Sequence, residues 1–216
     1  MKRLIVILFA IVLLFALTSM ASAQGLTGYG LKGGLNLANI SEDWSEDWDG
    51  VDKKMKLGFC VGGFVTYSIN EMFAIQPEVL YTQKGAKWEA EDWNDTEKLT
   101  YLEIPVLAKV TIPTQGNISP NLFVGPSLGI LLSAKYLEEW DGESEETDIK
   151  DDMKSTDFGL VFGAGVDIGM PHSAITVDGR YTLGLTNTCE PYEYDGEEIE
   201  CEEKNGVISF TVGYSF

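Results

Sequence analysis

Apolar and polar residues alternate with a period of two along eight long segments of this chain. Such alternation is typical of β-strands because successive side chains point to opposite faces. Each segment has 11 to 16 residues, more than the usual strand length of about 5 to 6 and enough for the roughly 9 to 11 residues of a tilted membrane strand. The pattern predicts an all-β protein, an eight-stranded antiparallel up-and-down transmembrane β-barrel, with strands at 28–38, 56–68, 72–84, 99–110, 121–136, 156–169, 174–187 and 206–216.

The connections between these segments alternate in length and charge. Three are short and carry Asn, Pro or Gly, whereas four are long and acidic. Short turns at one end and long loops at the other are typical of outer-membrane barrels. The short connections are 69–71, 111–120 and 170–173, and the long ones, which together carry a net charge of −21, are 39–55, 85–98, 137–155 and 188–205.

The polar faces of the predicted strands carry charges of both signs in equal number. In the last strand, for example, Ile208, Phe210 and Val212 share the face opposite Ser209 and Thr211. In a soluble barrel the oily face would fill the interior, whereas in a membrane barrel it contacts lipid. Balanced charges among glycines favour the second arrangement, because charges in a closed lumen must be paired. The expected lumen cluster consists of Lys32, Glu78, Lys84, Glu103, Lys109, Asp167, Asp178 and Arg180.

The same cluster could instead be a catalytic or proton-handling group, since carboxylates near cations are common in active sites. The interior of an eight-stranded barrel is just wide enough for side chains to fill, which favours a structural salt-bridged plug. The single histidine, His172, lies in a short turn beside Pro171. We find no partner set for a histidine-dependent hydrolase, no zinc-type spacing and no phosphate-binding glycine loop. We therefore expect no enzyme activity and no cofactor.

The first residues have the pattern of an export signal. Lys2 and Arg3 precede an apolar stretch, 4–17, and Ala21-Ser22-Ala23 offers small residues for cleavage before Gln24. We expect a signal peptide at 1–23 and a barrel domain at 24–216. Without Lys2 and Arg3 the formal charge of −19 becomes −21. Such an acidic chain is unsuited to nucleic acid, which needs clustered Lys and Arg.

All five tryptophans lie in the long acidic connections, mostly beside an acid: Trp44, Trp48, Trp88, Trp93 and Trp140. Some could belong to the aromatic girdle at the membrane interface. Alternatively, they form an extracellular recognition surface in which indoles anchor a partner and carboxylates attract divalent cations, basic partners or sugar hydroxyls. Asp47, Asp49 and Asp52 do not have the spacing of a dedicated calcium loop.

The cysteines also suggest an exported protein. Cys189 and Cys201 lie 12 positions apart in one long connection, and disulfides persist outside the cytosol. We expect them to pair and to stabilise the loop by roughly 3 kcal/mol. Cys60 lies on the inner face of the second strand and has the character of a small buried residue.

Five sequence elements resemble the PorT-type family of small outer-membrane β-barrel proteins: 30–36, 76–81, 101–109, 124–129 and 178–187. The resemblance covers nearly all of the mature chain. It implies a signal peptide, eight antiparallel strands and a terminal aromatic residue, and it does not imply a particular activity. The last strand, which ends at Phe216, is similar to the signal that the barrel-insertion machinery recognises. The long acidic loops with their tryptophans depart from the family pattern.

Taken together, these features predict a non-enzymatic barrel in the outer membrane of a Gram-negative-type envelope, surrounded by membrane lipid. Its lumen would be closed by salt bridges, and it would serve the envelope structurally or bind a partner at its surface. One alternative is a narrow pore or an accessory protein for transport or secretion. Another is a secreted soluble barrel that binds a lipophilic ligand.

Overall fold

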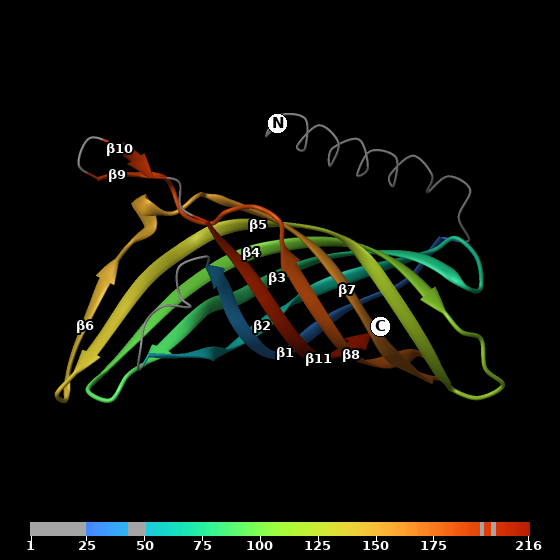
Figure 1. Cartoon of the computed structure of the whole chain (residues 1–216). Coiled ribbons are helices and arrows are strands. Elements are labelled where there is room, and N and C mark those ends of the chain that lie inside the picture. The colour runs from blue at the N-terminus through green and yellow to red at the C-terminus, as the bar shows by residue number, and fades with distance from the viewer. Residues whose placement is uncertain (1–24, 43–50, 195–196, 200–201) are drawn as a thin grey trace.

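The computed structural model describes residues 25–42, 51–194, 197–199 and 202–216. Eight strands of this part close into one antiparallel ring in the order β1–β2–β3–β4–β5–β7–β8–β11, with β11 paired to β1 (Figure 1). Their bounds are β1 Gly25–Glu42, β2 Asp52–Ser68, β3 Phe73–Glu89, β4 Trp93–Thr111, β5 Ile118–Trp140, β7 Thr156–Met170, β8 Ser173–Gly184 and β11 Glu203–Ser215. The predicted all-β, eight-stranded barrel is confirmed.

Smaller elements lie at one end of the ring. Strand β6, Glu143–Asp148, pairs with the end of β5, and β9, Tyr192–Tyr194, pairs with β10, Glu197–Ile199. A short 3-10 helix, η2, covers Lys150–Asp152. We call this end the hairpin end, and we call the opposite end, with the connections 69–72, 112–117 and 171–172, the turn end.

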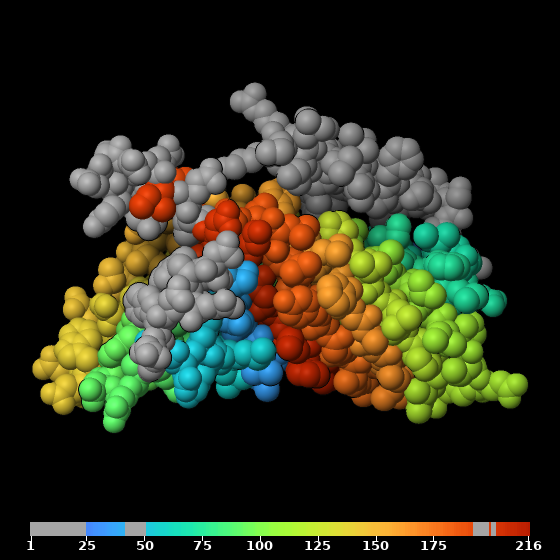
Figure 2. Space-filling view, viewed as in Figure 1, coloured from blue at the N-terminus to red at the C-terminus, as the bar shows by residue number. Residues whose placement is uncertain are grey.

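The oily faces of the strands point away from the lumen. Leu31 and Leu35 of β1, Leu57 of β2 and Phe210 of β11 each expose more than half of their surface. In the register of the sheet, Leu35 lies opposite Phe210. Side chains of this kind form the outward apolar band of a membrane barrel, and Figure 2 shows one side of this wall, over β1, β11 and β8. Among the described residues, no helix has the length and apolarity to cross a membrane.

Two of the connections predicted as long loops are largely strand. Strand β3 continues to Glu89 and β4 begins at Trp93, so only 90–92 remain between them. Likewise, β5 continues to Trp140 and turns into β6 through Asp141 and Gly142, both of which have positive φ. The prediction failed here because it followed apolar alternation, whereas these extensions carry charged side chains on both faces.

Cross-strand ion pairs stabilise the hairpin extensions, which have no apolar face. Lys98 of β4 and Lys135 of β5 both contact Glu146 of β6, at 3.0 and 2.5 Å. Gly85 lies in β3 at the start of its extension with a φ of +124°, a conformation that glycine adopts without strain. A Cβ at this position would lie 1.9 Å from the carbonyl oxygen of Glu97 on β4. The close pairing of the two strands therefore requires glycine here.

Candidate functional site

Four charged side chains meet in the middle of the lumen. The Nζ atom of Lys32 on β1 lies 2.7 Å from Oε1 of Glu78 on β3 and 3.0 Å from Oδ2 of Asp178 on β8. Arg180, also on β8, reaches Oε2 of Glu78 at 2.7 Å and Oδ2 of Asp178 at 3.1 Å. Because β3 and β8 lie opposite each other in the ring, the pair of Arg180 with Glu78 spans the lumen. We call these four residues the central layer.

Neighbouring groups complete the coordination of the central layer. The side-chain amide of Gln76 donates to Oε1 of Glu78 at 2.7 Å. The Lys32 ammonium lies 5.1 Å from the centre of the Phe64 ring, and the Arg180 guanidinium lies 5.2 Å from that of Phe123. Both distances suit cation–π contacts. All four charged residues are at most 6% exposed, so mutual pairing has to offset the loss of hydration.

A second layer lies toward the hairpin end. The Nζ atom of Lys84 on β3 is 3.2 Å from Asp157 on β7 and 3.6 Å from Glu103 on β4. Ser127 donates to Glu103 at 2.7 Å, and Asn205 donates to Asp157 at 3.0 Å. Asp157 was not among the predicted lumen residues, although it shares the inward-facing, odd-numbered positions of β7 with Asp167.

A third layer lies toward the turn end. Lys109 of β4 contacts Asp167 of β7 at 2.8 Å. Asn121 and Thr176 donate to the same carboxylate at 3.0 and 2.8 Å. The structure thus brings the eight predicted lumen residues together in three groups rather than in one cluster. Arg180 contacts Glu78 and Asp178, whereas Glu103 is paired with Lys84.

An apolar group, which was not predicted from the sequence, covers the layers at the hairpin end. Its buried members come from four of the strands (β1, β3, β4 and β5), from the residue after η2 and from the segment before β9: Ile40, Ala86, Leu99, Tyr101, Leu131, Ala134, Met153 and Cys189. Met153 and Cys189 form a β-bridge, and the backbone N–H of Lys154 donates to the carbonyl of Thr188 at 2.7 Å. We call this group the apolar cap.

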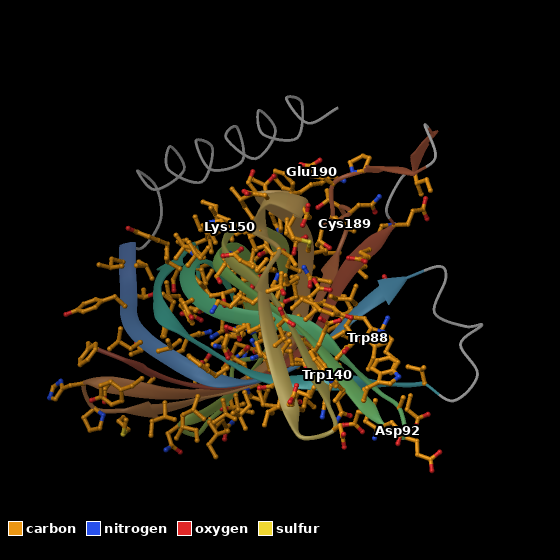
Figure 3. All side chains as sticks on the ribbon, turned by 90° about the vertical axis from the view of Figure 1, so that its left-hand side faces the viewer. Trp88, Asp92, Trp140, Lys150, Cys189 and Glu190 are labelled. Carbon is orange, nitrogen blue, oxygen red and sulfur yellow. The ribbon has the colours of Figure 1, made fainter. Side chains whose placement is uncertain are left out.

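The tryptophans divide between the cap and the hairpin tips. Trp88 packs against the apolar cap, and the Lys53 ammonium lies 5.7 Å from the centre of its ring. Trp93 and Trp140 face each other in the register of β4 and β5. Figure 3 shows Trp140 and Asp92 toward the hairpin tips, with Lys150, Cys189 and Glu190 above them. Trp44 and Trp48 lie outside the described residues.

The tips of the two hairpins enclose a hollow of about 400 Å³. Trp93 and Trp140 line it together with acidic side chains from both hairpins: Glu91, Asp92, Glu139, Asp141 and Glu143. Trp140 is 40% exposed. We call these seven residues the tip surface. It combines aromatic faces with a dense negative charge, which is the chemistry that attracts cationic groups.

Other candidate groups lie apart from these sites. Cys60 is a buried free cysteine, and Cys189 is disulfide-bonded, while Cys201, its predicted partner, lies outside the described residues. His172 occupies the short turn between β7 and β8, at the end opposite the tip surface. Within the described ranges, no group of three or more His, Cys, Asp or Glu residues has an arrangement that could hold a metal ion.

Comparison with known proteins agrees with this architecture. The sequence model of a family described as outer membrane protein beta-barrel domain matches residues 22–190. The chain belongs to this outer-membrane β-barrel family. It is accordingly a protein of the Gram-negative outer membrane and lies in membrane lipid, which is incompatible with the soluble-barrel alternative. The match does not test the finer PorT-type resemblance. No curated protein sequence matches the chain.

Several solved barrels are similar to the chain at low identity. Neisserial surface protein A (NspA) is 18% identical, with 89% of this chain and 100% of that one covered and a TM-score of 0.46. Ail, the attachment invasion locus protein of Yersinia pestis, is 17% identical, with 88% and 98% covered and a TM-score of 0.40. OprG from Pseudomonas aeruginosa is 12% identical, with 88% and 95% covered and a TM-score of 0.45.

Proposed function

We propose that the protein is a non-enzymatic surface receptor whose barrel carries a binding surface at its hairpin end and has a closed lumen. The observation that carries this proposal is the tip surface, where Trp93 and Trp140 lie opposite each other above the barrel. Five acidic residues line the same hollow as the two tryptophans. A partner with exposed Lys or Arg side chains would gain both cation–π contacts and charge attraction there.

The filling of the lumen supports a role outside it. The pair of Arg180 with Glu78 crosses between opposite strands, and the apolar cap lies between the ionic layers and the hairpin end. A polar solute on this route would have to displace both the ion pairs and the buried apolar side chains. This arrangement favours surface binding over the narrow-pore alternative.

The position of His172 supports a role without catalysis. Its turn lies at the far end of the barrel from the tip surface, next to Pro171. A general base needs to lie within hydrogen-bond reach of the proton that it removes. A partner held between Trp93 and Trp140 would be separated from His172 by the length of the barrel.

Binding of a basic peptide tests the proposed function. We expect a fluorescently labelled octa-arginine peptide to bind the detergent-folded barrel saturably in an anisotropy titration, and to bind more weakly as salt screens the charges. Replacing Trp93 and Trp140 together by Ala should weaken binding several-fold, because each exposed cation–π contact contributes about 0.5 to 1 kcal/mol. Titration with CaCl₂ alone in place of the peptide tests whether the same carboxylates take divalent cations.

Trp88→Ala is the matched control for the double variant. Trp88 is also a half-buried indole in a hairpin, but it packs against the apolar cap rather than lining the tip surface. Its replacement should leave peptide affinity unchanged. Equal affinity of the parent, the control and the double variant would contradict the assignment of the tip surface as the binding site.

A further inference from the structure

A groove crosses the outer wall of the barrel near the hairpin end. It has a volume of about 220 Å³ and is formed by residues of β1, β2, β8 and β11. Apolar side chains line most of it, namely Leu37, Met55, Leu183 and Ile208. The groove therefore opens on the side of the barrel that contacts membrane lipid rather than toward the lumen.

Gly206 creates the depression. It has the same outward parity on β11 as Ile208 and Phe210, and it lies between Asn39 of β1 and Leu183 of β8 in the register of the sheet. Asn39 and Leu183 carry side chains at this height of the wall, whereas Gly206 carries none. A Cβ at this position would lie 2.9 Å from the hydroxyl oxygen of Tyr181. Any side chain at position 206 would therefore begin to fill the groove.

A cation marks the upper rim of the groove. Lys204 lies two residues beyond Gly206 on the same face of β11, and it lines the groove together with Ser41, its register partner on β1. The outward residues on the other side of Gly206 are apolar: Ile208, Phe210, Val212 and Tyr214. Lys204 is thus the first charge beyond the apolar band, which places its ammonium at the level of lipid headgroups.

The Lys204 ammonium contrasts with other lysines at the hairpin end. Lys54, Lys98 and Lys135 each contact a carboxylate of another strand. Within the described part of the chain, Lys204 makes no ion pair. Its neighbour Glu203 has the opposite parity and lies on the inner side of β11. The positive charge is therefore available to a ligand that approaches from the lipid.

We propose that this groove is a binding site for a single phosphorylated membrane lipid. One acyl chain lies along the apolar walls over Gly206, and the phosphate contacts the Lys204 ammonium, with the Ser41 hydroxyl beside it. An apolar cleft with a few polar groups at one end has the general form of a small-molecule site, and a basic side chain near the membrane surface attracts anionic headgroups. Because the hairpin end is expected to face outward, this lipid would belong to the outer leaflet. The site itself does not depend on the proposed function.

Native mass spectrometry of the detergent-folded barrel tests this site. The probes are dipalmitoyl phosphatidic acid and dipalmitoylglycerol, which differ only in the phosphate. We expect the parent to retain one molecule of phosphatidic acid saturably. Lys204→Gln should weaken the binding of phosphatidic acid about fivefold and leave that of dipalmitoylglycerol unchanged. Gly206→Val should weaken the binding of both lipids about tenfold, because it displaces the acyl chain.

Two matched variants serve as controls. Gly179 also has outward parity, and a Cβ there would make ordinary contact with the Phe210 ring at 3.8 Å, so Gly179→Val should leave lipid retention unchanged. Lys54→Gln removes a lysine at the hairpin end that already contacts Glu89. Heat-dependent gel migration verifies that each variant is folded. Unsaturable binding, or equal retention by the parent, Gly206→Val and Lys204→Gln, would overturn the proposal and identify general annular lipid.

Discussion

At the scale of single residues, the lumen depends on charges that are removed from water and paired across the ring. The Glu78 carboxylate contacts both Lys32 and Arg180, and Asp178 contacts the same two cations. Removal of one partner leaves the others buried without full charge compensation. The stability lost in this way exceeds the net stabilisation that the intact ion pair provides. The central layer is therefore more sensitive to truncation than the ion pairs of the hairpins.

Arg180→Ala should lower the free energy of unfolding by on the order of 3 to 5 kcal/mol, because it leaves two buried carboxylates with Lys32 alone. Arg180→Lys should have an intermediate effect, since an ammonium lacks the two-pronged geometry of the guanidinium. The measurement is denaturant unfolding of the refolded barrel in detergent, followed by the gel shift between folded and unfolded bands.

Lys54→Ala is the control for this comparison. Lys54 also contacts a carboxylate, that of Glu89, but half of its side chain is exposed. Because solvent screens this pair, the denaturant midpoint of unfolding should barely change. Equal midpoints for Arg180→Ala and Lys54→Ala would rule out a packed lumen. Ion conductance of the parent in planar bilayers would then favour the narrow-pore alternative.

At the scale of elements, the hairpins continue the sheet beyond the barrel by means of charged side chains. Glu146 of β6 accepts hydrogen bonds from Lys135 and Lys98, and these hold the pKa of its carboxyl below the ordinary value of 4.5. A carboxyl group whose pKa is depressed by folding stabilises the folded form above its ordinary pKa, and this contribution is lost as the pH falls through the lower, folded value.

Acidification should therefore release β6 from β5 before the barrel itself unfolds. We expect the NMR amide signals of 143–148 in detergent micelles to shift as the pH falls below 4.5, while those of the central barrel strands stay in place. Glu146→Gln should remove this part of the pH response, because a neutral amide cannot titrate. An unchanged response in Glu146→Gln would assign the effect to other acids of the hairpin.

At the scale of the whole molecule, the chain has two distinct ends. The turn end carries short connections and both barrel termini, whereas the hairpin end carries the apolar cap and the tip surface. Such asymmetry is typical of outer-membrane barrels, whose long loops face the outside. The net charge of −21 in the long connections would accordingly lie on the outer surface of the cell.

Epitope tags test this orientation. Tags inserted after Asp49 and after Gly142 should be labelled on intact cells, because both positions belong to the long connections. A tag after Gly116, in the short connection 112–117, should be labelled only after the outer membrane is permeabilised. The reverse pattern would show that the tip surface faces the periplasm.

Closure of the ring brings the last residue into contact with the first strand. The backbone N–H of Phe216 donates to the carbonyl of Tyr29 at 2.8 Å, and its ring stacks on Tyr29 at a centroid distance of 5.7 Å. Deletion of Phe216 should reduce the membrane-inserted fraction in cells, since it removes both the predicted insertion signal and a contact at the β1–β11 seam.

Refolding in detergent distinguishes the two roles of Phe216. If the insertion machinery recognises this residue, the deletion variant should refold in detergent nearly as the parent does and fail mainly in cells, while Phe216→Tyr should insert normally. Normal insertion of the deletion variant would leave Phe216 as an interface residue only.

The sequence by itself determined the number of barrel strands and their inner and outer faces, and it placed eight charged side chains on the inner face. These properties are local, because alternation along a strand fixes which side chains share a face. It did not reveal the hairpin extensions, since charged residues on both faces carry no apolar pattern. It also did not reveal the apolar cap, in which Met153 and Cys189 join residues of four strands.

Only the tertiary structure decided which charges meet. Arg180 and Glu78 are 102 positions apart, and they pair because closure of the ring places β8 opposite β3. The stagger of the strands then sets the height of each side chain, so Lys84 meets Asp157 rather than the central layer. Parity gives the face of a residue but not its height or its position around the ring, and these two coordinates follow from the register and closure of the barrel.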